Sequence, residues 1–254
     1  EIYTLSLHDA LPISIFHELA IEYMLPKLPT LTSLKTENLY RLTSTRQLLM
    51  KSDKKRNGNV LLCGGVDFFK ASQGDQNENE DPYTNDGLAY HHLKALELWF
   101  GNLPGTKAEI QGIRNEYDST FIVLLTDTLA TETKAAYMIG QYPIVHLATH
   151  GFFIGATPEG TDLLPASYDE SLSQSGIVFA GATSALYKKD FDAAHHDGLL
   201  SSREISQMDF SGVDLIVLSA CQTALGYMTD DGVYGLQRSL KNAGVKAMIL
   251  SLWS

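Results

Sequence analysis

Two apolar runs of this chain each lead into a side chain that can take part in nucleophilic chemistry. Residues 144–149 are followed by His150, and residues 215–220 are followed by Cys221. A thiol with an ordinary pKa of about 8.5 is only a few per cent thiolate at neutral pH, and a nearby imidazole makes such a cysteine a usable nucleophile. The residue types therefore predict a cysteine–histidine dyad of His150 and Cys221.

The dyad requires two neighbouring strands, and the pattern of the chain provides them. Apolar runs of four to eight residues alternate with amphipathic or polar segments, which is typical of βα units around a parallel sheet. The carboxyl ends of parallel strands line one edge of a sheet, so His150 and Cys221 can meet although they are far apart in the sequence. We predict six strands, at residues 60–63, 121–126, 144–149, 176–180, 215–220 and 247–252.

Helices are predicted between these strands from the positions of apolar residues and of glycine stops. They cover residues 90–100, 106–117, 131–139, 202–207 and 232–243, with Gly101 and Gly244 as C-terminal stops. Two polar, glycine-containing segments, residues 73–86 and 155–170, are predicted to be loops.

Composition limits the class of protein. With 254 residues, 44% of them hydrophobic, the chain can bury a sizeable core, and we expect one large α/β domain. A net charge of −11 argues against a nucleic-acid-binding surface, which needs clustered lysine and arginine. No apolar run reaches 18 residues, so no transmembrane helix or membrane partner is predicted. We expect a cytoplasmic protein with reduced thiols, in which Cys63 is a buried strand residue.

Three ordered motifs carry a resemblance to a known family. They are His-Leu-Ala-Thr-His-Gly at 146–151, Leu-Ser-Ala-Cys-Gln-Thr-Ala at 218–224, and the segment 232–244 together with Ser-Leu-Trp at 251–253. Together they resemble the CHAT domain, a bacterial relative of caspases and separases. Further stretches match in the same order at 44–49, 103–109, 175–182 and 197–200. The resemblance implies a caspase-like α/β sandwich, in which a mostly parallel six-stranded sheet has helices on both faces.

The resemblance also implies an activity. Cys221 would attack a peptide carbonyl, His150 would serve as the proton carrier, and the backbone N–H groups of Gly151 and Cys221 would form the oxyanion hole. The implied function is a cysteine endopeptidase that cuts a specific protein partner without cofactor or metal, regulated by an N-terminal region such as tetratricopeptide repeats. A non-catalytic signalling or scaffold module with a silent dyad remains the alternative, because a fold does not dictate a function.

The substrate pocket has weaker candidates. In several caspase-like families the residue two positions before the nucleophile lines this pocket, and here it is Ser219, which carries no fixed charge. Asp230 and Asp231 are further pocket candidates, with a solvated loop as the alternative. His146 lies on the same strand face as His150, but four strand residues span about 13 Å, so we expect a core histidine rather than a metal ligand.

Both ends of the chain look artificial at the level of sequence. Residues 1–13 resemble translated sequencing-adapter read-through of the kind found in assembled metagenomic genes. We therefore expect residues 1–14 to be an artefactual leader, residues 15–38 to be a remnant of an upstream region, and residues 39–254 to be a CHAT domain truncated at its C-terminus.

Overall fold

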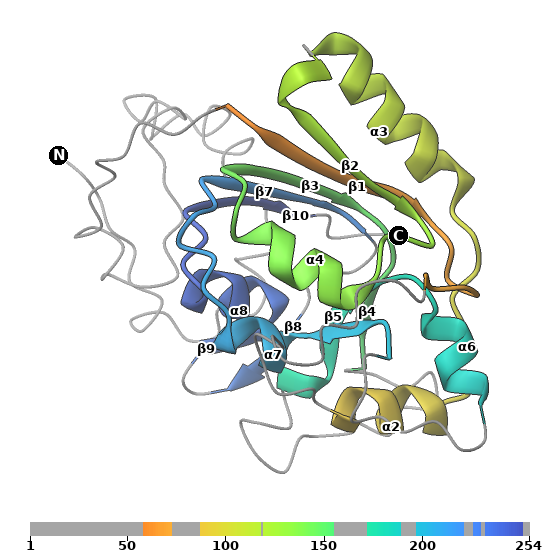
Figure 1. Cartoon of the computed structure of the whole chain (residues 1–254). Helices are drawn as coiled ribbons and strands as arrows, with labels where there is room; N and C mark the ends of the chain where they lie inside the picture. The colour runs from red at the N-terminus through yellow and green to blue at the C-terminus, as the bar shows by residue number, and fades with distance from the viewer. Residues whose placement is uncertain are drawn as a thin grey trace, which may run out of the picture. The chain divides into compact units, whose positions relative to one another are not determined.

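A parallel sheet of five strands forms the centre of the larger compact unit of the chain, Arg56–Tyr227 with Tyr234–Ser254. The computed structural model describes residues 58–72, 87–117, 119–154, 172–188, 197–220, 226–229 and 232–250. The strand order is β10-β7-β3-β1-β2, and every neighbouring pair is parallel (Figure 1). The strands are β1 (Val60–Val66), β2 (Ile122–Asp127), β3 (Ile144–Ala148), β7 (Leu215–Ser219) and β10 (Ala247–Leu250).

The fourth predicted strand, at residues 176–180, lies in a different sheet from the other five. It corresponds to β5 (Ser175–Val178), the middle strand of an antiparallel sheet with β4 (Gly151–Phe153) and β6 (Leu199–Ser201). All four residues of β5 are buried. An apolar run of this kind reveals a buried strand but not the sheet to which it belongs, so the predicted six-stranded sheet is corrected to five strands.

Each face of the parallel sheet packs on a different layer. Helix α3 (Pro104–Glu116) covers one face, where Val60, Leu62 and Ala148 cluster with Ile110 of the helix (Figure 1). Along each strand, successive side chains point to opposite faces of the sheet. The other face therefore receives Leu61, Cys63, Val145, Leu147, Ile216 and Leu218.

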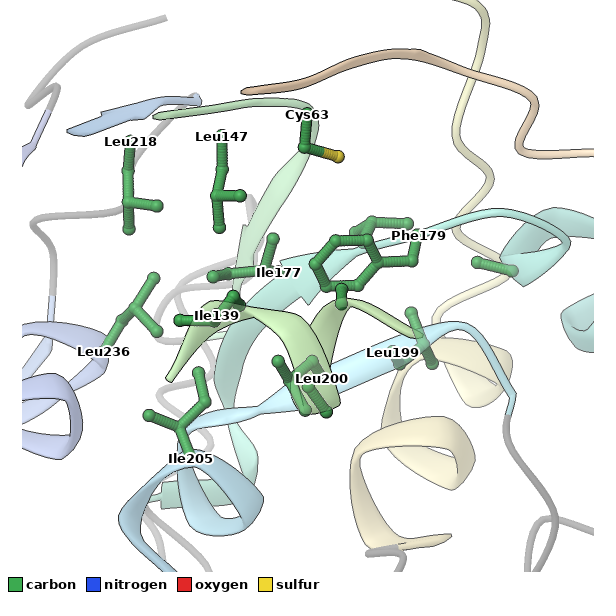
Figure 2. Close-up of a cluster of buried hydrophobic side chains, with 14 of the residues drawn as sticks. Cys63, Ile139, Leu147, Ile177, Phe179, Leu199, Leu200, Ile205, Leu218 and Leu236 are labelled. Atoms are coloured by element: carbon green, nitrogen blue, oxygen red, sulfur yellow. The ribbon is translucent and has the colours of Figure 1, made fainter. Parts of the chain in front are cut away.

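That second face packs on helices and on the smaller sheet. Helices α4 (Glu132–Ile139) and α8 (Leu236–Asn242) contribute Ile139 and Leu236 to the core. Figure 2 shows Leu147 and Leu218, from the adjacent strands β3 and β7, directed towards the layer in which these two side chains lie. The predicted α/β class, with helices on both sides of a mostly parallel sheet, is confirmed.

The remaining helices are short. Helix α7 (Ser202–Gln207) has the predicted bounds, and Ser201 and Glu204 form a capping box at its start. The helix predicted at 90–100 is α2 (Gly87–Ala95), so Gly101 is not its stop. Helix α6 (Ala182–Tyr187) and the 3-10 turn η5 (Ser119–Phe121) were not predicted.

The segment predicted as a helix at 232–243 is divided. Its first four residues form β9 (Gly232–Gly235), which pairs with β8 (Gly226–Thr229) in a two-stranded sheet, and α8 follows. Gly244 adopts a φ of 105° directly after this helix, so the predicted stop is confirmed. The predicted loops at 73–86 and 155–170 lie outside the described residues. Within the described ranges, no helix has the length and apolar character needed to span a membrane.

Candidate active site around His150

His150 occupies the junction between the two larger sheets. Strand β3 of the parallel sheet ends at Ala148, and β4 of the antiparallel sheet begins at Gly151. The Oγ1 hydroxyl of Thr149 donates to the Val178 carbonyl at 2.7 Å, and the Val178 N–H donates to the His150 carbonyl at 2.9 Å. The backbone on both sides of the imidazole is therefore held by β5.

The imidazole ring has a defined environment. It contacts the rings of Phe68 and Phe100, with centroid separations of 4.9 and 5.4 Å. Its Nε2 atom lies 2.8 Å from the carbonyl oxygen of Gly101. A carbonyl oxygen only accepts hydrogen bonds, so Nε2 carries the proton and donates. In the neutral ring the lone pair is consequently on Nδ1.

Burial keeps this ring neutral. Desolvation lowers the pKa of His150 below its ordinary value of 6.5, and the hydrogen bond to Gly101 opposes that shift only in part. At pH 7 the side chain is therefore an uncharged imidazole with a basic Nδ1. Such a group can accept a proton from a thiol and later return it.

Helix α6 holds the backbone of both phenylalanines through hydrogen bonds from Thr183. Thr183 uses its Oγ1 twice on Phe100, accepting from the backbone N–H at 3.0 Å and donating to the carbonyl at 2.9 Å. The Thr183 N–H also donates to the Phe68 carbonyl at 2.9 Å. One threonine thus fixes both segments that enclose the imidazole of His150.

The strand that leads to Cys221 is the neighbour of β3. In the ladder between β3 and β7, Ala148 pairs with Ser219. His150 and Cys221 each follow their member of this pair by two residues. Cys221 itself lies outside the described residues, as do Asp230 and Asp231, and their roles stay predictions.

Gly151 begins β4 at the outer edge of the antiparallel sheet. Hydrogen bonds from Val178 to His150 and from Ile154 to Gln174 place the even-numbered residues of this segment in the bonded positions. Alternate residues of an antiparallel strand direct their N–H groups to opposite sides. The N–H of Gly151 is therefore directed away from β5, and its predicted oxyanion role remains a prediction.

Ser219 and His146 are joined by a residue that the sequence did not single out as a site. The Ser219 hydroxyl donates to Oε2 of Glu109 at 3.1 Å, and the His146 Nε2 lies 2.8 Å from Oε1 of the same carboxylate. His146 is thus a largely buried histidine with a polar partner, as predicted. Among the described residues, no group of three or more histidine, cysteine or acidic side chains is arranged to hold a metal ion.

A family comparison agrees with this architecture. A model of the CHAT domain family matches residues 19–254. The chain belongs to the CHAT domain family. This family is related to the caspase-like cysteine peptidases. A comparison with curated proteins gave no match.

The other cysteine of this CHAT domain, Cys63, has an unreactive thiol. Cys63 is fully buried in β1 within the core shown in Figure 2, and burial raises the pKa of its thiol to about 12. A thiol in this state carries almost no thiolate at neutral pH. Cys63 is therefore a structural residue, as predicted, and an internal control for reactivity at Cys221.

Sequence reasoning missed four residues of the CHAT domain site. Gly101 was assigned as a helix stop, whereas its carbonyl orients His150. Phe68 lies after the strand predicted at 60–63, and Phe100 was the last residue of the helix predicted at 90–100; neither gave a signal beyond being apolar. Glu109 ends the family-like stretch 103–109, which was the only available indication of its role.

Proposed function

We propose that this CHAT domain is a cysteine endopeptidase in which His150 and Cys221 hydrolyse peptide bonds. The observation that carries the proposal is the state of His150, a neutral imidazole whose Nε2 is occupied by Gly101 and whose Nδ1 retains a lone pair. The register between β3 and β7 supports a partner at Cys221. Paired residues of adjacent strands lie about 4.8 Å apart, and both dyad residues follow the Ala148–Ser219 pair by two positions.

The reaction proceeds in two stages. His150 Nδ1 takes the thiol proton as the sulfur of Cys221 bonds to the carbonyl carbon of the substrate. The C–N bond then breaks, His150 gives the proton to the leaving amine, and a thioester remains. A water molecule attacks this thioester while His150 accepts its proton, and the acid product and the free thiol are released. Every proton is thereby accounted for by one imidazole.

The developing oxyanion needs donors, and Gly151 is the proposed one beside the Cys221 N–H. Its N–H is directed away from β5, and it has no side chain to obstruct a substrate. Loss of one oxyanion donor costs about 10²- to 10³-fold in turnover in enzymes of this kind of chemistry.

The test is covalent labelling of the 254-residue chain by a peptidyl acyloxymethyl ketone, followed by mass spectrometry of the modified peptide. The parent is compared with Cys221→Ala, His150→Ala and Cys63→Ala. We expect labelling of the parent and of Cys63→Ala, none of Cys221→Ala, and strongly slowed labelling of His150→Ala. The Cys63 variant is the matched control, because its thiol is buried and has a raised pKa.

The alternative function predicts a different pattern. In a non-catalytic scaffold, Cys221 is an ordinary thiol and does not depend on His150. Equal labelling rates of the parent and of a folded His150→Ala variant would therefore reject the peptidase and favour the scaffold. Circular dichroism of each variant distinguishes this outcome from simple unfolding.

A further inference from the structure

Glu109 connects the two strands that lead to the dyad. One carboxylate oxygen, Oε1, contacts His146 Nε2 of β3 at 2.8 Å, and the other, Oε2, accepts from the Ser219 hydroxyl of β7 at 3.1 Å. Each of these partners lies a short distance before a proposed dyad residue, four positions before His150 and two before Cys221. The carboxylate thus has one contact on each strand.

The position of Glu109 is fixed by the docking of its helix. The first turn of α3 lies against β1 so closely that a Cβ atom on Gly64 would be 2.8 Å from the Thr106 carbonyl and 2.9 Å from Ile110 Cγ2. The Gly65 N–H also donates to Thr106 Oγ1 at 2.9 Å. Helix α3 therefore cannot slide along the sheet without breaking these contacts. Glu109 lies about one turn after Thr106 on the same helix, so its backbone is held in place by the same contacts.

Glu109, His146 and Ser219 do not form a second nucleophilic site. A serine nucleophile needs a hydrogen bond from its hydroxyl to the histidine that removes its proton. Here the Ser219 hydroxyl donates to Glu109, and His146 binds the same carboxylate through its other oxygen. The side chain of His146 is 12% exposed and that of Glu109 35% exposed, so the contacts are partly shielded from water.

We propose that Glu109 is a positioning residue that joins the middle of β3, at His146, to the carboxyl end of β7, at Ser219, and so sets the geometry between His150 and Cys221. The inference rests on the proposed peptidase function. Glu109 touches none of the reacting atoms, and it acts through His146 and Ser219. Because a misplacement of about 1 Å can lower turnover about 100-fold, a small shift between these strands affects catalysis more than binding.

The experiment compares three variants of the 254-residue chain. Glu109→Ala removes both contacts. Glu109→Gln keeps them, because the amide oxygen accepts from His146 and the amide N–H donates to the Ser219 hydroxyl. Lys107→Ala is the matched control, since Lys107 lies on the same helix but contacts Asp127 of β2 at 3.1 Å, a strand without a dyad residue.

Two quantities are measured on each variant. The first is kcat and KM on a fluorogenic peptide selected from a library with the parent protein. We expect Glu109→Ala to lower kcat at least about tenfold with KM changed less than about twofold, Glu109→Gln to stay within about threefold of the parent, and Lys107→Ala to match it. The second is amide hydrogen exchange at the ends of β3 and β7, which should accelerate in Glu109→Ala only.

The outcomes separate this inference from the function on which it rests. If the parent neither turns over peptides nor labels in a dyad-dependent manner, the proposed function fails, while hydrogen exchange still decides whether Glu109 locks the strands. If Glu109→Ala keeps the parental kcat, or if its exchange equals that of Lys107→Ala, the positioning role is refuted. Failure of Glu109→Gln to restore kcat also refutes it.

Discussion

Replacement of Asp197 by asparagine should flatten the pH dependence of stability. Asp197 is 2% exposed, its Oδ1 accepts from the Leu199 N–H at 2.9 Å, and its Oδ2 has no hydrogen-bond partner within the described part of the chain. Burial, and then the nearby charges of Glu132 and Glu204, raise the pKa of Asp197 well above its ordinary value. The folded protein therefore holds this proton at pH values where the unfolded chain has lost it.

The sign and the magnitude follow from proton linkage. Between the unfolded-state pKa of about 3.9 and the raised folded-state pKa, the native state binds one more proton than the unfolded state, so stability falls by about 1.4 kcal/mol per pH unit. The contribution of Asp197 is complete below the lower pKa and is lost as the pH rises through the higher one. An asparagine has no proton to lose and no such slope.

The assay is urea unfolding of the parent and of Asp197→Asn from pH 4 to pH 8. Titrating groups that do not interact with Asp197 cancel in the difference between the two proteins, because they are common to both. We expect the variant to gain stability relative to the parent by up to about 1.4 kcal/mol per pH unit, with a plateau above the folded-state pKa. The substitution preserves the acceptor for Leu199, so the fold should be retained.

Parallel curves for the two proteins would refute this reasoning. They would mean that Asp197 titrates at its ordinary pKa in the folded state and is not desolvated. A difference that decreases as the pH rises would refute it more strongly, because the sign would then indicate a stabilised carboxylate.

Two further predictions concern His150 and the antiparallel sheet. In a plot of kcat/KM for peptide hydrolysis against pH, the rise on the acid side should have its midpoint below pH 6.5. Only the neutral imidazole of His150 accepts a proton, and burial lowers the pKa of this imidazole. A midpoint above pH 6.5 would contradict the described environment of His150. Gly176→Ala should destabilise the protein by about 1–3 kcal/mol or prevent folding, since the new Cβ would collide with the Leu200 carbonyl and lie 2.6 Å from Phe152 Cζ. An unchanged urea midpoint would show that β5 can yield at this position.

The parallel strands could be predicted from the sequence because they are continuous apolar runs. The predicted strand at 144–149 corresponds to Ile144–Ala148, and that at 215–220 corresponds to Leu215–Ser219. One face of each strand is buried and the other is mostly only partly buried, yet most residues on both faces are apolar, which produces a nearly continuous apolar run. Pairing partners leave no such trace, so β5 was assigned to the wrong sheet.

The helix predicted at 232–243 failed in its first four residues for a local reason. Helical periodicity was extended backwards into Gly232–Gly235, which form a strand instead. Glycine lacks a side chain and pays a high entropic cost in a helix, so its presence at both ends of this segment was a signal against the extension. The short strands β4 and β6, of three residues each, carry too few positions for any periodic pattern.

The sequence predicted a residue of the candidate site only where a side chain within a recognisable motif carries the chemistry. His150 was identified by its motif, whereas the carbonyl of Gly101 was not, because every residue carries a carbonyl and only the fold selects one. Glu109 likewise reads as an ordinary polar helix position until α3 is docked on the sheet. Ser219 was expected to line a pocket, and its hydroxyl was not expected to bind a helix.

The environment of His150 is assembled from distant parts of the chain. Phe68 precedes the histidine by 82 positions and Gly101 by 49, while Thr183, which fixes both flanking segments, follows it by 33. Contacts of this range depend on the tertiary fold, since the intervening loops must be closed before the contacts stabilise anything. A nascent or partly folded chain therefore carries an ordinary, solvated histidine. The neutral, basic imidazole that the proposed peptidase mechanism requires is therefore a property of the folded molecule alone.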